Sequence, residues 1–149
     1  MKKAKRILVG LKMPEQAVTL TNAACRLGAK TASLILVHVI ELPDPTPLNA
    51  DVPELDAMAA RILQAGERVA RKSGMKVRTL ALRARNAGEV LLMEMREKQI
   101  DLGVIGYHHR STLGEILLGT SAKHLMKHAP CDLICIIPPH QRIRQLSEQ

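Results

Sequence analysis

The sequence predicts an α/β protein, a single-domain open sheet of five parallel strands with helices on both faces. Short apolar runs alternate with segments of helical periodicity along the chain, a pattern typical of parallel sheets. The run at 32–40 is apolar almost throughout, as expected of a strand covered on both faces. At 149 residues, the chain has the length of one domain.

Each expected strand is a short apolar run bounded by charged residues, glycine or proline. By residue number the strands are 5–11, 32–40, 75–82, 102–105 and 133–137. Pro138 and Pro139 close the last one, because proline cannot continue a strand's hydrogen bonding. Helices that alternate with these strands imply crossover connections and therefore parallel pairing.

Helices are expected where apolar residues recur three or four positions apart. The first begins at Pro14, which suits a helix's first turn, and stops before Gly28. Asn86 and Glu89 have the spacing of a capping box at the start of the third. By residue number the helices are 14–27, 53–73, 87–99 and one that follows Gly119.

Two segments are expected to lack regular structure. Prolines crowd the stretch between Pro43 and Pro53, which predicts a mobile loop whose role the sequence leaves open. The last residues, 141–149, are polar and are expected to form a frayed tail behind a domain at 1–140.

The composition argues against a membrane protein and against a secreted one. No apolar stretch approaches the roughly 20 residues that span a bilayer. The basic, then apolar N-terminus is like the start of a signal peptide, but Lys12 interrupts it before any cleavage site. The three cysteines, Cys25, Cys131 and Cys135, form no disulfide framework and are expected to be buried thiols. The sequence therefore predicts a cytoplasmic protein.

The net charge of +8 favours an anionic ligand or partner. Basic residues gather at the N-terminus and between Arg68 and Arg85. The chain has no Trp, no Phe and a single Tyr, Tyr107, so the aromatic platforms that stack single-stranded bases are nearly absent. Nucleic acid is therefore not the expected partner.

The stretch 101–121 combines the backbone features that suit a phosphate. An apolar strand stops at Gly106, a polar loop follows, and Gly119 opens a new helix. Free amide groups and the positive end of the helix dipole there favour an anion. Ligands of open parallel sheets bind outside the carboxyl ends of the strands. Residues 10–13, 39–41 and 106–121 are therefore expected to converge.

Gly106, His109 and Gly119-Thr120 stand at the spacing of a known signature: glycine, two residues, glycine, nine residues, then glycine with Ser or Thr. The segments LILVHVIE, NAGEVLLMEMREKQIDLGVIG and GEILLGTSAKHLMKHAPCDLICI are similar to that family's second strand, third helix with fourth strand, and loop to last strand. On these residues the chain, from Arg6 to Pro138, resembles the universal stress protein family.

The resemblance implies an adenine-nucleotide alpha-hydrolase-like, Rossmann-like fold and a role in the stress response. It also implies a homodimer, formed by antiparallel pairing of the last strand from Leu133 to Ile137. The implied ligand is ATP or another adenine nucleotide, held as a signal rather than turned over. No catalytic residue and no metal ion are expected.

The resemblance also assigns residues to the two ends of the nucleotide. Those around the phosphates are Gly106, His109, Arg110, Gly119, Thr120 and Ser121. Those around the nucleoside are Gly10, Leu11, Lys12 and Val39.

Two positions depart from the nucleotide-binding members of the family. His109 stands where they have glycine, and Lys12 stands where they have aspartate. Members with a Gly-His-His loop, which is similar to Gly106-Tyr107-His108-His109, are not thought to hold ATP.

Two interpretations remain open at this point. In the first, the loop holds a nucleotide, since histidine tolerates left-handed conformations better than most residues. In the second, the glycines are turn and cap residues of a scaffold whose basic face docks an acidic protein or nucleic acid. An enzyme that slowly cleaves the nucleotide is disfavoured, because no Walker lysine and no magnesium-holding carboxylate stand beside the loop.

Three further histidines have plain structural interpretations. His124 and His128 lie four residues apart on the last helix, a spacing that can suit a metal. No third ligand is apparent, so a solvated helix face is expected. His38, within the second strand, is expected to be a buried, hydrogen-bonded imidazole.

Overall fold

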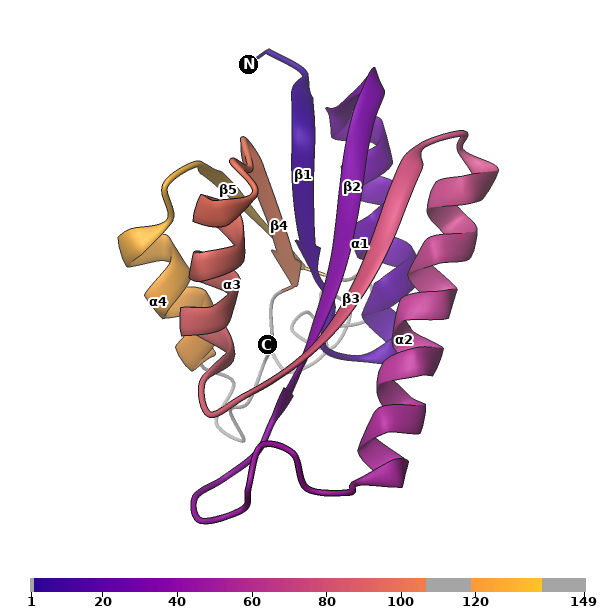
Figure 1. Ribbon diagram of the computed structural model, residues 1–149. Coiled ribbons are helices and arrows are strands. Elements are labelled where there is room, and N and C mark those ends of the chain that lie inside the picture. Colours follow the sequence, from indigo (N-terminus) through magenta and orange to yellow (C-terminus); the bar gives the residue numbers. More distant parts are fainter. Residues whose placement is uncertain (1, 107–118, 138–149) are drawn as a thin grey trace, which may run out of the picture.

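The computed structural model describes residues 2–106 and 119–137. These residues form a single α/β layer structure with a five-stranded sheet (Figure 1). The strands are β1 (Ala4–Gly10), β2 (Gly28–Glu41), β3 (Lys76–Ala84), β4 (Leu102–Gly106) and β5 (Asp132–Ile136). The helices are α1 (Pro14–Leu27), α2 (Pro53–Lys72), α3 (Ala87–Glu97) and α4 (Thr120–His128). The strand order is β3-β2-β1-β4-β5 and every pairing is parallel. The predicted fold class is confirmed.

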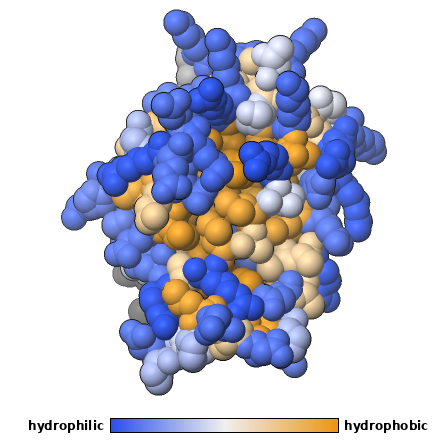
Figure 2. All heavy atoms as spheres, in the orientation of Figure 1, coloured by the Kyte–Doolittle hydropathy of each residue, from blue (hydrophilic) through white to orange (hydrophobic). Residues whose placement is uncertain are grey.

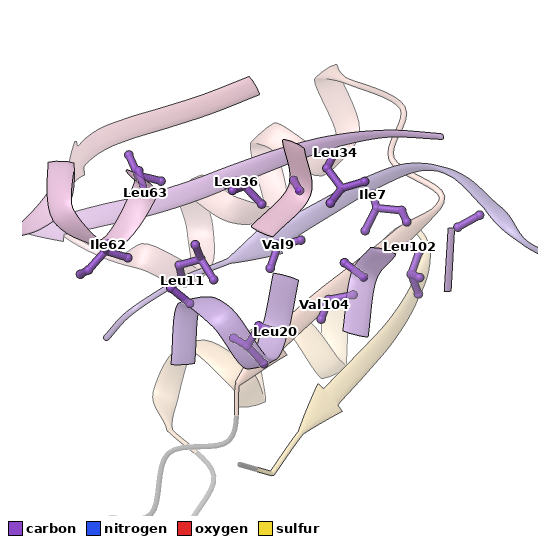
Figure 3. Close-up of a cluster of buried hydrophobic side chains, with 14 residues drawn as sticks. Ile7, Val9, Leu11, Leu20, Leu34, Leu36, Ile62, Leu63, Leu102 and Val104 are labelled. Atoms are coloured by element: carbon purple, nitrogen blue, oxygen red, sulfur yellow. The ribbon is translucent and has the colours of Figure 1, made fainter. Parts of the chain in front are cut away.

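Alternating residues of the central strand build two cores. Ile7 and Val9 of β1 face α1 and α2, where they meet Leu20 and Ile62 (Figure 3). Leu8, between them in the sequence, faces the opposite side, where it belongs to the cluster formed with α3 and α4. Successive side chains of a strand point to opposite faces, so a nearly continuous apolar run serves both layers.

The helix starts follow from the sequence as expected. Pro14 and Pro53 occupy the first turns of α1 and α2, where a missing N–H costs nothing. Asn86 caps α3, because its side-chain oxygen accepts a hydrogen bond of 3.2 Å from the N–H of Glu89. The predicted cap is confirmed.

β2 begins at Gly28, four residues earlier than predicted, directly after α1. Gly28 has an extended backbone, with φ of −83°, so its left-handed freedom is not used. A Cβ at this position would lie 3.0 Å from Ile7 and 3.1 Å from Met75. Close packing of three chain segments therefore explains this glycine.

The three cysteines are free and half-buried rather than fully buried. Cys131 lies just before β5, and Cys135 lies within it. Burial raises the pKa of the thiols of Cys25, Cys131 and Cys135 above the ordinary value. These thiols therefore carry less of the reactive thiolate at neutral pH.

No helix in the described part of the chain is long and apolar enough to cross a membrane. Figure 2 shows apolar residues gathered in the middle of one face and hydrophilic side chains projecting from the upper end. That end is where the strands begin and the N-terminus lies (Figure 1). It carries the exposed side chains of Lys2, Lys3 and Lys5. The predicted tail at 141–149 lies outside the described residues.

Two arginines anchor the proline-rich segment 42–52, which is irregular as predicted. The Arg83 guanidinium donates hydrogen bonds to the carbonyl oxygens of Leu48, at 3.0 Å, and Ala50. It also donates to both carboxylate oxygens of Asp56, at 2.9 Å each. The segment is therefore tied to the end of β3.

Arg85 holds the beginning of the same segment. Its guanidinium donates to the carbonyl oxygens of Leu42, at 3.1 Å, Pro43, at 3.0 Å, and Thr46. It also forms an ion pair of 3.4 Å with Asp44. The sequence predicted mobility here, whereas these contacts predict an anchored segment.

The anchoring predicts that Arg85→Gln exposes the segment 42–52 to proteases. Loss of several hydrogen bonds weakens local structure by about 1–2 kcal/mol, so cleavage is expected to accelerate roughly tenfold. Limited proteolysis with mass spectrometry measures this rate. Arg78→Gln is the matched control, because Arg78 is an exposed arginine of β3, the strand that Arg85 follows. Equal cleavage rates in both variants would contradict the anchoring.

Asp101 joins the start of β4 to the start of β1. Its carboxylate accepts hydrogen bonds from the N–H groups of Lys5, at 3.0 Å, and Arg6, at 3.1 Å. Its own N–H donates to the Arg6 carbonyl at 3.0 Å. One side chain therefore caps the central strand.

Asp101→Ala is expected to lower the free energy of unfolding by about 1–2 kcal/mol, because two backbone donors lose a charged acceptor. Urea unfolding followed by circular dichroism gives this value. Asp132→Ala serves as the control, since Asp132 is an exposed carboxylate at the start of β5. The capping role is wrong if the two substitutions destabilise the protein equally.

Candidate functional site

The topology opens a crevice where the chain leaves β1 and β4. β1 lies between β2 and β4, and the chain continues from β1 into α1 on one face of the sheet. α4, which follows β4 along the chain, packs on the other face. Neighbouring strands whose connections diverge in this way leave a gap at their carboxyl ends. All the site residues discussed below lie at this gap.

An apolar hollow forms the first part of the site. Leu11 and Val39 contribute from the ends of β1 and β2, Ile105 from β4, and Leu91 and Leu125 from α3 and α4. Such a wall suits the flat apolar face of a heterocyclic base.

A polar hollow adjoins the first, with Lys12, Glu41, Gly106 and Ser121 common to both. Gly119 and Thr120 line it from the start of α4. The N-cap residue, Gly119, makes no side-chain cap, so among the described residues the first-turn amides and the positive end of the dipole favour an anion.

Lys12 and Glu41 are the charged side chains at the junction of the two hollows. Both are exposed, and neither forms an ion pair within the described residues. The ammonium group of Lys12 adds positive charge near the α4 start, and the carboxylate of Glu41 opposes it. The junction is therefore mixed in charge, whereas the α4 end favours anions.

The structure brings together all the predicted site residues that it describes. Those in the apolar hollow are Gly10, Leu11, Lys12, Val39 and Gly106. Those in the polar hollow include Gly119, Thr120 and Ser121. His109 and Arg110 lie outside the described residues. Within the segments expected to converge, Met13 and Ile40 line neither hollow, and residues 107–118 lie outside the described residues.

Three polar lining residues were not among the predicted nucleotide-binding residues: Gln16, Asn86 and Glu41, the last within the segment 39–41 that was expected to converge. Gln16 is a buried polar residue in the first turn of α1, 3% exposed. A Cβ at position 106 would lie 2.8 Å from its side-chain oxygen, so Gly106 leaves room for this carboxamide. No sequence pattern marked Gln16 as a lining residue, because its place beside Gly106 depends on tertiary packing, and Asn86 was recognised as a cap alone.

His38 is buried and hydrogen-bonded, as predicted. Its Nδ1 lies 2.7 Å from the carbonyl oxygen of Leu11. A carbonyl oxygen can only accept, so Nδ1 carries the proton and donates.

The described residues contain no group of three or more His, Cys, Asp or Glu side chains that could hold a metal ion. His124 and His128 contact each other with ring centroids 4.9 Å apart. His124 is half-buried beside Gly88 and His128 is exposed. The two histidines lie on one side of α4, as expected for a partly solvated helix face.

Residues 3–136 of the chain match the model of the universal stress protein family. The chain belongs to the universal stress protein family. A comparison with curated proteins found no match.

Solved structures of this family share the fold. A universal stress protein from Archaeoglobus fulgidus is similar with a TM-score of 0.72 and 22% identity, over 89% of this chain and 98% of that one. A family protein from Burkholderia pseudomallei has a TM-score of 0.70 and 25% identity, over 91% and 98%. A universal stress protein in complex with cAMP has a TM-score of 0.69 and 18% identity, over 91% and 98%. Other similar structures hold dAMP, in the Archaeoglobus fulgidus protein, and AMP, in one from Arabidopsis thaliana.

Proposed function

We propose that this universal stress protein binds ATP or another adenine nucleotide as a signal, in the crevice at the carboxyl ends of β1, β2 and β4. The observation that carries the proposal is the junction of an apolar hollow with a helix N-terminus whose N-cap residue, Gly119, makes no side-chain cap. A nucleotide has the same division, with an apolar base at one end and anionic phosphates at the other.

In this proposal the nucleoside lies in the apolar hollow, against Leu11 and Val39. The phosphates lie at Gly119, Thr120 and Ser121, where backbone amides and hydroxyl groups donate hydrogen bonds. Lys12 supplies a charge that nucleotide-binding relatives do not have at this place. Family structures with cAMP, dAMP and AMP support the ligand class.

The proposal is for binding rather than efficient turnover. The phosphate end offers amides, hydroxyls and an ammonium group, which hold an anion. Hydrolysis also needs a positioned water and stabilisation of the leaving group. Glu41 is the one carboxylate among the described lining residues, a residue that the sequence had not placed beside the phosphates.

The alternative, a scaffold that docks through its basic face, has less support. Three arginines of the basic stretch are engaged within the chain: Arg71 with Glu67, Arg83 with Asp56 and Arg85 with Asp44. These ion pairs partly neutralise the three guanidinium charges, which leaves less positive charge for an acidic partner. A cytoplasmic location and a stress-response role remain predictions.

We also infer that two copies pair through β5. This strand is at the edge of the sheet, and its apolar residues from Leu133 to Ile136 are half-exposed. An apolar edge strand is an aggregation hazard unless another chain covers it. The opposite edge, β3, carries the exposed charges of Lys76 and Arg78, which discourage pairing there.

Millimolar ATP is expected to raise the melting temperature of the wild-type protein. At about 100 times the dissociation constant, the stabilisation is about 2.7 kcal/mol. Thr120→Val should reduce it, because it removes a hydroxyl group proposed to bind the phosphates. Lys12→Gln should also reduce it, because it removes a positive charge from the junction of the two hollows, whereas His109→Gly should keep or increase it. Thermal unfolding measures the shift, and mass spectrometry of the denatured protein identifies any nucleotide that co-purifies.

Thr79→Val is the matched control, since Thr79 is an exposed threonine on β3, away from the crevice. Lys12→Gln should leave the stabilisation by adenosine unchanged, because adenosine has no phosphate charge for Lys12 to attract. A flat response of the wild type and all variants would overturn nucleotide binding and favour the scaffold.

The dimer proposal predicts that the wild-type protein sediments as a dimer and that Ile134→Lys sediments as a monomer, because a charge would be buried in the paired edge. Sedimentation velocity reports the state, and circular dichroism checks that the variant is folded. Thr79→Lys, on the opposite edge strand, should remain dimeric. A monomeric wild-type protein would show the proposal to be wrong.

A further inference from the structure

A third hollow lies beside the crevice, between the end of β2 and the start of α2. Its volume is about 370 Å³, and Ile40 of β2 forms an apolar wall together with Leu55 and Met58 of α2. His38 contributes the one uncharged polar side chain among its described lining residues. A hollow of this size and character suits a small organic molecule.

This hollow opens on the opposite face of the sheet from the apolar hollow. Successive side chains of a strand alternate between the two faces, so His38 lies on the face of Leu36, which packs with α1 and α2. Val37 and Val39 belong to the cluster on the other face. The two hollows share Lys12 at their rims, but their floors lie on different sides of β2.

The apolar stripe of α2 continues into the third hollow. The buried residues of this helix include Ala59 and Ile62, and Ile62 packs in the core beside α1 (Figure 3). Leu55 and Met58 stand four residues before these two and therefore lie on the same side of the helix. They are nevertheless 43% and 37% exposed, and the first turns of α2 reach past the end of β1 (Figure 1). Two large apolar side chains of a core-facing stripe are thus left uncovered by the described strands.

His38 presents a hydrogen-bond acceptor to this hollow. Its Nδ1 donates to the Leu11 carbonyl at 2.7 Å, so Nε2 of the neutral ring carries no proton and can only accept. Within the described residues Nε2 makes no hydrogen bond. It is not sealed off either, since Oγ1 of Thr21 is the one enclosed side-chain polar atom there that lacks a partner. A histidine that is 9% exposed therefore keeps an acceptor for the hollow that it lines.

The charges at the rim favour a neutral ligand. Lys12 and Glu41 bring one ammonium and one carboxylate group to the lining, so an ion of either sign meets a like charge. The ammonium group attracts the face of an aromatic ring, and the thioether of Met58 contacts the edge of a ring favourably. An aromatic ligand therefore gains more from this lining than an aliphatic one.

We propose that the third hollow binds a small neutral aromatic molecule with one N–H or O–H donor, of the indole or phenol class. The ring packs against Leu55 and Met58, and its donor group meets Nε2 of His38. This binding site is separate from the proposed nucleotide site, and its occupation requires no nucleotide.

Indole and benzofuran are the probes that test the donor. The two molecules have nearly the same shape, but benzofuran has an oxygen atom where indole has its N–H. The wild type should bind indole roughly tenfold more tightly than benzofuran, because benzofuran leaves the buried acceptor unmatched. Titration followed by NMR of labelled leucine and methionine methyl groups reports affinity and place together, and the signals of Leu55 and Met58 should shift.

Two substitutions of His38 separate the acceptor from simple packing. His38→Asn can still donate to the Leu11 carbonyl but has no atom at the position of Nε2, so it should bind the two probes about equally. His38→Gln places a side-chain oxygen near the position of Nε2 and should restore the preference for indole. A histidine that served packing alone would give no such difference between the two variants.

A substitution at the exposed wall leaves the core unchanged. Met58→Glu should weaken the binding of indole at least roughly tenfold, because a carboxylate replaces the apolar contact. Met93→Glu is the matched control, since Met93 is an exposed methionine of α3 that does not line the hollow. Circular dichroism checks that each variant is folded.

Several results would overturn the proposal. One is the absence of shifts at Leu55 and Met58 when the wild type is titrated with indole. Another is a set of shifts centred on Leu91 and Leu125, which would place indole in the apolar hollow instead. Equal affinity of the wild type for indole and benzofuran, or equal affinity of Met58→Glu and Met93→Glu for indole, would also show it to be wrong. Because each titration is made without nucleotide, a failure of nucleotide binding would leave these results unchanged.

Discussion

β1 lies at the centre of the sheet, and the side chains of Ile7, Leu8 and Val9 are excluded from solvent. The two layers of helices depend on these residues, because two point to one layer and one to the other. The parallel register of β1 with β2 and β4 places the carboxyl ends of all three at one edge. Burial of this strand thus fixes the position of the crevice as well as the core.

The end of β1 matters as much as its burial. Because β1 stops at Gly10 while β2 continues to Glu41, no strand of the described residues lies beside the β2 backbone beyond Val37 on the β1 side. A shortened central strand therefore creates the space of the apolar hollow. The same departure of the chain at Leu11 exposes the carbonyl that His38 contacts.

The basic side chains do not form one continuous surface, because some are paired within the chain and others face the crevice. Arg83 and Arg85 neutralise carboxylates and hold the segment 42–52, while Lys12 faces the crevice. The start of α4, with Gly119 as its N-cap residue, contributes partial positive charge there from its backbone. An anion at the crevice would therefore be attracted both by the backbone at the α4 start and by the side chain of Lys12.

The sequence alone determined the fold class and the place of most elements. An apolar run such as that in β2 predicts a strand covered on both faces. A cap such as Asn86 can be recognised because its partner, Glu89, lies three residues away. The glycines at 106 and 119 likewise marked a strand end and a helix start, because these signals are local.

Tertiary structure alone decided the contacts between distant segments. Arg83 meets carbonyl groups 35 and 33 residues earlier, and His38 meets Leu11 at a separation of 27 residues. Nothing in the periodicity of either segment encodes such a partner, because a side-chain hydrogen bond depends on positions fixed by the packing of the whole sheet. The neighbours of Gly28 and the place of Gln16 beside Gly106 were hidden for the same reason.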